Sequence, residues 1–440
     1  MRRVILMLGL AFAALSISAQ SVSGEKLVLS LEQALEIALS ENLTIKVADQ
    51  EIEIKRYAKQ GTYAGLYPQI DATAQYQRII EKQTMSMNGM AFKVGTPNTF
   101  SGGVTAAMPI VSAQLWTNLK ISALDVELAV EKARSSRIDM VEQVTSAYYL
   151  ALLAKESHAL YKRVYDNAVE NNKIVKDKYD VGSVSEFDLI RSNVTVQNAI
   201  PNVVSAENSV TLALWQLKAL LGINLEKDID VVGSLLDYES VLKNGYELSQ
   251  LSLDRNSSLV QLGIQEDMLE KAVKLTKMAN VPTLSANIAY LYTAMGTGDT
   301  FFTKAAWNPY SYAGLQLNIP IFAGNKRRAA TREARLNLAN LKLQRENTER
   351  QLRVAIVQHL NNMQTSVKTY HSSSATVGQA QRGYDISVKR YEVGSGTLVD
   401  IDNSQLALTQ AELSRNQSIY NFLTAKVSLD KVLGAYESDK

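Results

Sequence analysis

The sequence predicts a mainly α-helical chain with a small membrane β part, built from two copies of one helix, hairpin and long-helix unit. Three observations predict this class. The chain begins with a secretory signal, and the remainder repeats itself after about 212 residues. Each copy also places two strand patterns between stretches of long helical periodicity.

The first residues form a targeting segment that is not part of the fold. Met1 is followed by two arginines, an apolar run from Val4 to Leu15, and small residues that end at Ala19. An apolar core of about 12 residues is typical of a secretory signal and is too short for a spanning helix. We therefore expect residues 1–19 to be a cleaved signal peptide.

The composition argues against several classes of function. The chain contains no cysteine, so it has neither disulfides nor thiolate metal sites. Lysine and arginine number 46 against 44 acidic residues, a balance that offers no electrostatic surface for nucleic acid. The 3 histidines lack the spacing of metal ligands, and no nucleophile or phosphate-loop motif is present. We expect no enzyme activity, no resident metal and no cofactor.

The mature chain is an internal duplication. The segment YDVGS at 179–183 returns as YEVGS at 391–395. A unit of about 200 residues is too long for a solenoid repeat and indicates a duplicated domain. We expect the first copy over residues 20–228, an equatorial connector over 229–246, and the second copy over 247–440.

Both copies present their elements in the same order. Helical periodicity covers about residues 30–66, 112–179 and 184–221 in the first copy, and about 247–281, 324–391 and 396–433 in the second. The central helix of each copy has about 68 residues and is therefore about 100 Å long. The two shorter helices of a copy together match this length, which predicts a long column of paired helices.

The helices that follow the two turns carry heptads in a matching register. One seam of each heptad holds small residues, namely Ser192, Ala199, Ala206 and Ala213 in the first copy and Ser404, Ala411, Ser418 and Ala425 in the second. Small residues in a seam permit close helix packing. Pro201 falls inside the first of these helices and predicts a kink there.

Four strand patterns alternate apolar and polar residues, as outer-membrane barrel strands with a wet lumen do. They cover about residues 69–80, 100–110, 283–294 and 310–321. Four strands cannot close a barrel, and an open edge cannot face lipid because its backbone groups would stay unpaired. Closure therefore requires oligomerisation. Eight strands from two copies are filled by their own side chains, so a conduit requires twelve strands from three.

Several motifs occur in duplicate and in a fixed order behind the signal. They are Leu29–Ala38 at a helix start, Leu66–Ile70 before a strand, Pro109-Ile110 and Pro320-Ile321-Phe322 before the long helices, and the two Tyr-x-Val-Gly-Ser turns. Each motif is weak alone, but the duplicated set is specific. On these residues the mature chain resembles the TolC family of outer-membrane efflux proteins, also called outer membrane factors.

The resemblance implies a homotrimer in the cell outer membrane, in contact with its lipid. Its twelve-stranded β-barrel would continue as a long periplasmic α-helical coiled-coil barrel. The implied function is the exit duct of a tripartite efflux or type I secretion system, served by a periplasmic adaptor (membrane fusion) protein and an inner-membrane transporter of RND, ABC or MFS type. The alternative is a periplasmic or outer-membrane coiled-coil structural or adhesion protein without a conduit, which would show no conductance in planar bilayers.

The resemblance also implies a periplasmic gate. By position, Asp188 and Tyr391 match a closing pair, and Asp400 matches an inward-facing acid. Three carboxylates around an axis would favour cations and narrow the passage. The alternative for Asp188 and Asp400 is an acid that is favoured in the first turn of a helix by the helix dipole.

The chain departs from the family pattern at two gate positions. Gly396 stands where the family has an arginine of the closing network, and Asn403 stands where it has a second acid, although Asp402 is adjacent. We expect a closing network that is weaker or differently built.

Adaptor hairpins of the family dock near the helical tips, in a helix-in-groove mode. The matching residues are Gly182, Ser183, Gly394 and Ser395. The same glycines also serve as turn formers between antiparallel helices, which is compatible with docking.

Overall fold

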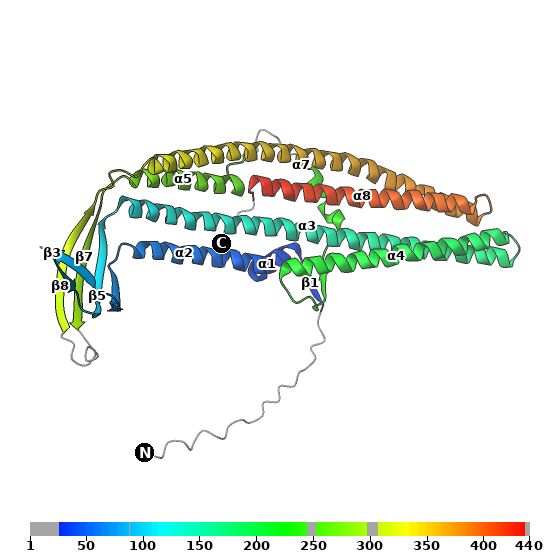
Figure 1. Ribbon diagram of the computed structural model, residues 1–440. Helices are drawn as coiled ribbons and strands as arrows, with labels where there is room; N and C mark the ends of the chain where they lie inside the picture. The colour runs from blue at the N-terminus through cyan, green and yellow to red at the C-terminus, as the bar shows by residue number, and fades with distance from the viewer. Residues whose placement is uncertain (1–25, 88, 244–251, 297–306, 436–440) are drawn as a thin grey trace, which may run out of the picture.

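The computed structural model describes residues 26–87, 89–243, 252–296 and 307–435 (Figure 1). The expected signal peptide, residues 1–19, lies outside these ranges, as does the end of the expected connector. Long helices lie side by side in one elongated layer, and a β-sheet stands at one end of it (Figure 1). None of the described helices contains an apolar stretch sufficient to span a bilayer.

Among the described residues, two helices run the whole length of the layer and five shorter ones accompany them. The long helices are α3 (Ala113–Asp180) and α7 (Lys326–Glu392), and the shorter ones are α1 (Leu31–Glu41), α2 (Leu43–Ala64), α4 (Glu186–Leu221), α5 (Ser257–Met278) and α8 (Leu398–Leu433). Helices α2 and α4 lie along α3, and α5 and α8 lie between α3 and α7 (Figure 1). The layer therefore ends in α7 on one side and in α2 and α4 on the other.

Two of the expected helices begin or break at an asparagine. The helix expected over 30–66 is split at Asn42, and the helix expected over 247–281 begins only at Ser257, after Asn256. The expected bounds were wrong because an asparagine side chain competes for backbone N–H groups and so starts a new helix.

These two asparagines are equivalent in the duplication and make equivalent bonds. Asn42 Oδ1 accepts from the N–H of Thr44 at 2.7 Å, while its Nδ2 donates to the carbonyl of Leu220 at 2.7 Å. Asn256 caps α5 in the same way and donates to the carbonyl of Val432 at 2.7 Å. Each asparagine therefore joins the start of one short helix to the end of the other, where they meet at mid-length.

The heptad seams of α4 and α8 are buried as their small residues predict. Ala199, Ala206 and Ala213 are buried on α4, and Ala411 and Ala425 are buried on α8. Helix α4 continues through Pro201 without interruption. The small seams allow α4 to lie close to α3 and α8 close to its neighbours.

The main sheet is antiparallel throughout, in the order β2-β5-β7-β8. Its strands are β2 (Gln69–Arg78), β5 (Asn98–Val111), β7 (Thr283–Gly296) and β8 (Trp307–Asn318). The strand expected over 310–321 was placed three residues late, because Pro320 has no N–H for the ladder and the chain leaves the sheet before it. A hairpin of β3 (Gln83–Met87) and β4 (Met90–Val94), which the pattern did not predict, lies between β2 and β5.

The register keeps one face of the sheet apolar across all four strands. Ile70 pairs with Ala106, Ala106 with Ile288, and Ile288 with Ala313. The adjacent row, which begins at Asp71, points to the other face. Ile288 is 60% exposed, although it lies on a central strand. Such a face requires lipid or another apolar cover.

A belt crosses one face of the layer at mid-length. It consists of β1 (Leu27–Leu29), which pairs in parallel with β6 (Ile229–Val231), and the 3₁₀ helix η1 (Leu235–Lys243). Two side chains of α3 hold the belt: Tyr148 donates to the carbonyl of Val232 at 2.6 Å, and Lys155 pairs with Asp230 at 2.8 Å. The expected connector over 229–246 thus contains β6 and η1.

We predict that Asn42→Ala destabilises the protein by about 2 kcal/mol, because the helix cap is lost and the carbonyl of Leu220 loses its donor. The midpoint of thermal unfolding, followed by circular dichroism, measures this loss. Asn118→Ala replaces an exposed asparagine inside α3 and should leave the midpoint nearly unchanged. Equal midpoints for the two variants would contradict the proposed role of Asn42.

Candidate periplasmic gate and docking tips

Two equivalent turns form the end of the layer that lies farthest from the sheet (Figure 1). Gly182 and Gly394 have φ values of 74° and 80°, a left-handed conformation that favours glycine. The N–H of Ser183 bonds to the carbonyl of Lys178, and the N–H of Ser395 bonds to the carbonyl of Arg390, both at 2.8 Å. The expected docking residues are thus the closing residues of two helices, and their backbone is exposed at the tips.

Asp188 and Asp400 both serve as capping residues of the helices that follow the turns. Asp188 accepts from the hydroxyl of Ser185 at 2.8 Å, and Asp400 accepts from the hydroxyl of Thr397 at 2.8 Å. Each pair is a reciprocal capping box. The bonds from Thr397, and then the charge of Arg390, lower the pKa of Asp400. Within one chain, Asp188 and Asp400 therefore act as first-turn acids of their helices, as the alternative interpretation of these two residues expects.

Two helical hairpins meet at the tips, one formed by α3 and α4 and the other by α7 and α8. Tyr391 lies in a small buried cluster between these two hairpins. Its side chain is 6% exposed and packs with Val175, Leu398 and Ile401. Burial, and then the charge of Asp188, raise the pKa of Tyr391. The tyrosine hydroxyl is buried and has no hydrogen-bond partner among the described residues. Asp188 and Tyr391 are thus neighbours, but the expected bond between them does not form within one chain.

Lys178 connects the two hairpins at the tips. Its ammonium group donates to the carbonyl of Tyr391 and, at 3.0 Å, to the carbonyl of Glu392, which are the last residues of α7. It also lies 4.6 Å from the centre of the Tyr391 ring. A cation at the C-terminus of a helix is favoured by the helix dipole. The sequence reading missed Lys178, although its equivalent in the second copy, Arg390, is also basic.

Asp402 forms a second connection between the hairpins. Its carboxylate pairs with Arg191 of α4 at 3.1 Å. Asn403 is exposed, and the duplication places it at the position equivalent to Arg191. The charge of Asp402 is therefore balanced by Arg191, a cation that the sequence analysis did not single out.

The tip turn has no room for a side chain at Gly396. A Cβ atom there would lie 3.0 Å from the Cβ of Arg390 and 3.1 Å from the backbone nitrogen of Tyr391. Arg390 itself donates to the carbonyl of Ser395 at 3.0 Å and acts on the charge of Asp400. An arginine is thus present at this tip, six residues before the position where the family pattern places it.

Further polar contacts join the two hairpins away from the tips. Asn167 donates to Gln405 at 3.0 Å, Asn171 donates to the hydroxyl of Tyr384 at 3.2 Å, and Arg163 pairs with Glu412. A hollow of about 450 Å³ lies between α3, α4 and α8, and Asp402 and Gln405 are part of its lining. The hairpins are therefore joined by polar contacts that water can replace, in addition to the apolar cluster around Tyr391.

Comparisons with known proteins agree with this architecture. The chain is 24% identical over 387 residues to the pyoverdine export outer membrane protein OpmQ of Pseudomonas aeruginosa, which covers 86% of the chain and 79% of that protein. It is 20% identical to the outer membrane protein TolC of Escherichia coli, over 77% of the chain and 70% of TolC. The solved CmeC outer membrane channel of Campylobacter jejuni matches with a TM-score of 0.74 at 19% identity, over 93% of the chain and 87% of CmeC.

The fold, together with these relatives, defines a channel subunit of the outer membrane, whose long paired helices continue from a membrane sheet into the periplasm. The family of outer membrane efflux proteins matches residues 34–223 and 248–435, and the chain belongs to that family. It is an exit duct and not an enzyme. The expected fold class, mainly α with a small β part in a duplicated helix, hairpin and long-helix unit, is confirmed.

We predict that the cap at Asp400 weakens in acid. Because its pKa is lowered in the folded state, the cap contributes stability above the unfolded value of about 4 and loses it as the pH falls through the folded pKa. Hydrogen exchange at residues 397–401, corrected for intrinsic rates, should rise from pH 5 to pH 3. Asp400→Asn should remove this dependence, whereas Asp177→Asn, at an exposed acid of α3, should keep it.

Proposed function

We propose that three copies of the chain assemble edge to edge into a duct whose periplasmic entrance is closed by the tips. The proposal rests on one observation: the two edges of the sheet continue into the two edges of the helical layer. Strand β2 follows α2, and strand β8 precedes α7. One neighbour can therefore satisfy an edge strand and cover the edge helix attached to it.

Both edge helices expose apolar residues at heptad spacing. On α7 they include Leu336 and Leu343, which are 64% and 65% exposed. On α2 they are Leu43, Val47 and Ile54. The two seams run in opposite chain directions, as two edges that meet around a ring require. We therefore assign the subunit contact to α7 of one copy and α2 of the next copy. Farther from the sheet, α4 of the next copy would continue the same contact with α7.

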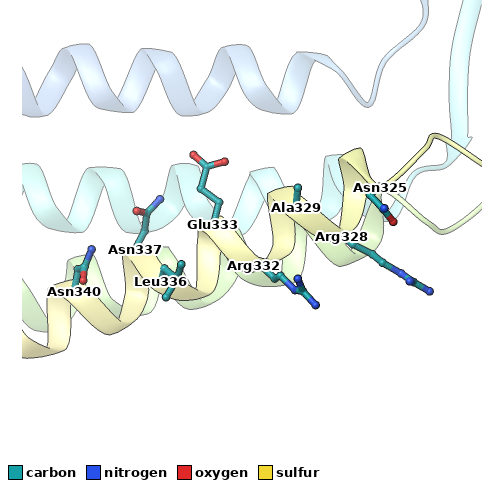
Figure 2. A pocket seen from close by; sticks show the side chains of 8 residues that line it. All are labelled: Asn325, Arg328, Ala329, Arg332, Glu333, Leu336, Asn337 and Asn340. Carbon is teal, nitrogen blue, oxygen red and sulfur yellow. The ribbon is translucent and has the colours of Figure 1, made fainter.

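A hollow of about 790 Å³ follows this edge of α7 near the sheet (Figure 2). It is lined by residues of α7 alone, among them Ala329, Arg332 and Leu336. A hollow with only one wall is an incomplete contact, and the next subunit's helix would supply the other wall.

We predict that Leu336→Glu together with Leu343→Glu prevents trimer formation, because six glutamates per trimer would lie in apolar seams. Native mass spectrometry of the detergent-purified protein should give mainly monomer. Asn118→Glu together with Ala159→Glu introduces the same charge at exposed positions of α3, which lies inside the layer and away from both of its edges. This control should remain trimeric, and a trimer in the first variant would contradict the assignment.

The belt supports an assignment of the two faces of the layer. Lys155 of α3 reaches the belt. Ser157 lies two positions farther along α3, about 200° around the helix axis, and lines a hollow on the opposite face of the layer. A duct needs an open bore, so the belt belongs outside and the hollow that Asp402 lines belongs to the bore. Asp402 would thus be the inward acid, held by Arg191.

The gate that we propose has two parts. Within each copy, Lys178 and Arg191 join the hairpins. Between copies, Asp188 lies close enough to the tip to meet a neighbour's groups as the tips converge. The hydroxyl of Tyr391, which is buried and has no partner among the described residues, would meet such groups when the tips rearrange on assembly. Opening would separate the hairpins, and water would replace the polar contacts at modest cost.

We predict that Asp188→Ala together with Tyr391→Phe makes the duct leak, because the closing contacts at the tips are lost. Susceptibility of the producing strain to large antibiotics should rise, and open conductance in planar bilayers should occur more often. Asp166→Ala together with Tyr165→Phe makes the same two changes on the side of α3 and should do neither. Unchanged permeability at a normal trimer level would count against the gate.

We further propose that an adaptor docks at Gly182, Ser183, Gly394 and Ser395. Exposed backbone and small side chains let a helical hairpin approach closely. The inner-membrane transporter that the adaptor serves would then decide the cargo. The relatives include a pyoverdine exporter and the alkaline protease secretion protein AprF of Pseudomonas aeruginosa, so both efflux and type I secretion fit this duct. Cross-linking from Ser183→Cys and Ser395→Cys in cells would identify the adaptor.

A further inference from the structure

Positive charge gathers where four helices meet the sheet. The last ten residues of α2 and of α5 and the first ten of α3 and of α7 contain twelve lysines or arginines and two glutamates. The corresponding ten-residue ends of α3, α4, α7 and α8 at the tips contain six basic and eight acidic residues. The excess of cations is therefore confined to the membrane end of a chain that is nearly neutral as a whole.

Seven of these cations are exposed and form no ion pair with any residue in the described parts of the chain. Farther along α7 the pattern is different, because Lys342 and Arg345 both pair with Glu266, at 3.2 and 3.0 Å. We call four of the seven the basic collar: Lys274, Lys277, Arg328 and Arg335. Lys120 lies on α3, Lys326 begins α7, and Arg332 lines the hollow assigned to the subunit contact one turn before Leu336 of the seam, so these three are left out.

Helix stability does not account for the cations on α7. Its first turn holds Lys326, Arg327 and Arg328 and no acid, and Asn325 makes no side-chain cap. Cations at a helix N-terminus oppose the helix dipole. Arg328 and Arg332 are also four residues apart, a spacing at which like charges repel. An anion outside the chain would relieve both costs.

The collar cations on α7 are exposed on one side of that helix. Arg328 and Arg335 are one heptad apart, which places them about 20° apart around the helix axis. Figure 2 shows the side chain of Arg328 extending away from the other helices of the chain.

Exposed apolar residues lie between the sheet and the collar. Ile321 is 90% exposed and Phe322 is 87% exposed, and both follow the end of β8. Arg328 comes six residues after Phe322, at the start of α7. An apolar rim followed by cations matches the order of acyl chain and headgroup at the lower surface of a bilayer.

We propose that the basic collar binds the headgroup phosphates of anionic phospholipids in the inner leaflet of the outer membrane. In a trimer, twelve such cations surround the duct just below the acyl region, within reach of the headgroups of one leaflet. The lipid class is set by charge: a net-negative glycerophospholipid satisfies the arginines, whereas a zwitterionic one supplies its own counter-ion. The inference rests on the proposed trimer only for the completeness of the ring.

The test uses the full-length trimer in nanodiscs of phosphatidylethanolamine and phosphatidylglycerol, at 3:1. Native mass spectrometry after gentle release counts the two lipids retained per trimer. The wild type should retain phosphatidylglycerol above its share of the mixture. Lys274→Gln, Lys277→Gln, Arg328→Gln and Arg335→Gln together should lower this enrichment at least about threefold. The matched control removes the same charge far from the membrane: Lys162→Gln, Lys173→Gln, Lys176→Gln and Lys368→Gln.

The outcomes separate this proposal from its alternatives. Lost enrichment in the collar variant, with the control and the single-channel conductance unchanged, supports the lipid site and leaves the duct intact. Equal enrichment in the collar variant and the wild type would overturn it, as would an equal loss in the control. Sedimentation with purified peptidoglycan sacculi that falls only in the collar variant, without a change in lipid enrichment, would assign the collar to the cell wall instead.

Discussion

The structure depends on one constraint: backbone N–H and C=O groups cannot remain unpaired in lipid. A single chain contributes a main sheet of four strands, and β2 and β8 are its edges. Because β2 follows α2 and β8 precedes α7, any neighbour that satisfies an edge strand also covers the edge helix. In the trimer that we propose, the barrel and the helical column would therefore be one continuous wall, and the seams of α2 and α7 would close the part of that wall below the membrane.

The two ends of the column use charge in different ways. At the tips, Asp188 and Asp400 cap their own helices, and Lys178 and Arg191 join one hairpin to the other. These contacts are polar and partly exposed, so they can be exchanged for water at modest cost. At the membrane end the collar cations form no ion pair with any of the described residues, which makes that end dependent on what surrounds it. A wall that must stay fixed in a bilayer while its far end moves is consistent with this division.

The long elements were predicted well, and the junctions between them were not. Long runs of period 3.6 locate α3 and α7 to within about two residues, and alternation locates the strands because each face meets one environment throughout. Asn42 and Asn256 interrupt helical patterns that hydrophobicity alone would continue, since their effect comes from a side-chain hydrogen bond. The β3–β4 hairpin lacks clear alternation, and the sequence pattern did not distinguish it from a loop.

The sequence by itself determined the duplication, the order of elements, the two tips and the need for partner strands, because each follows from local pattern or from a count. Only the tertiary structure decided which side chains meet across the hairpins. Lys178 and Arg191 find their partners on helices about 210 residues away, and no local spacing specifies such a contact. The same holds for Tyr391, whose burial depends on two hairpins packing together. The physical reason is that periodicity reports one element's environment, whereas a contact between elements depends on how both are placed.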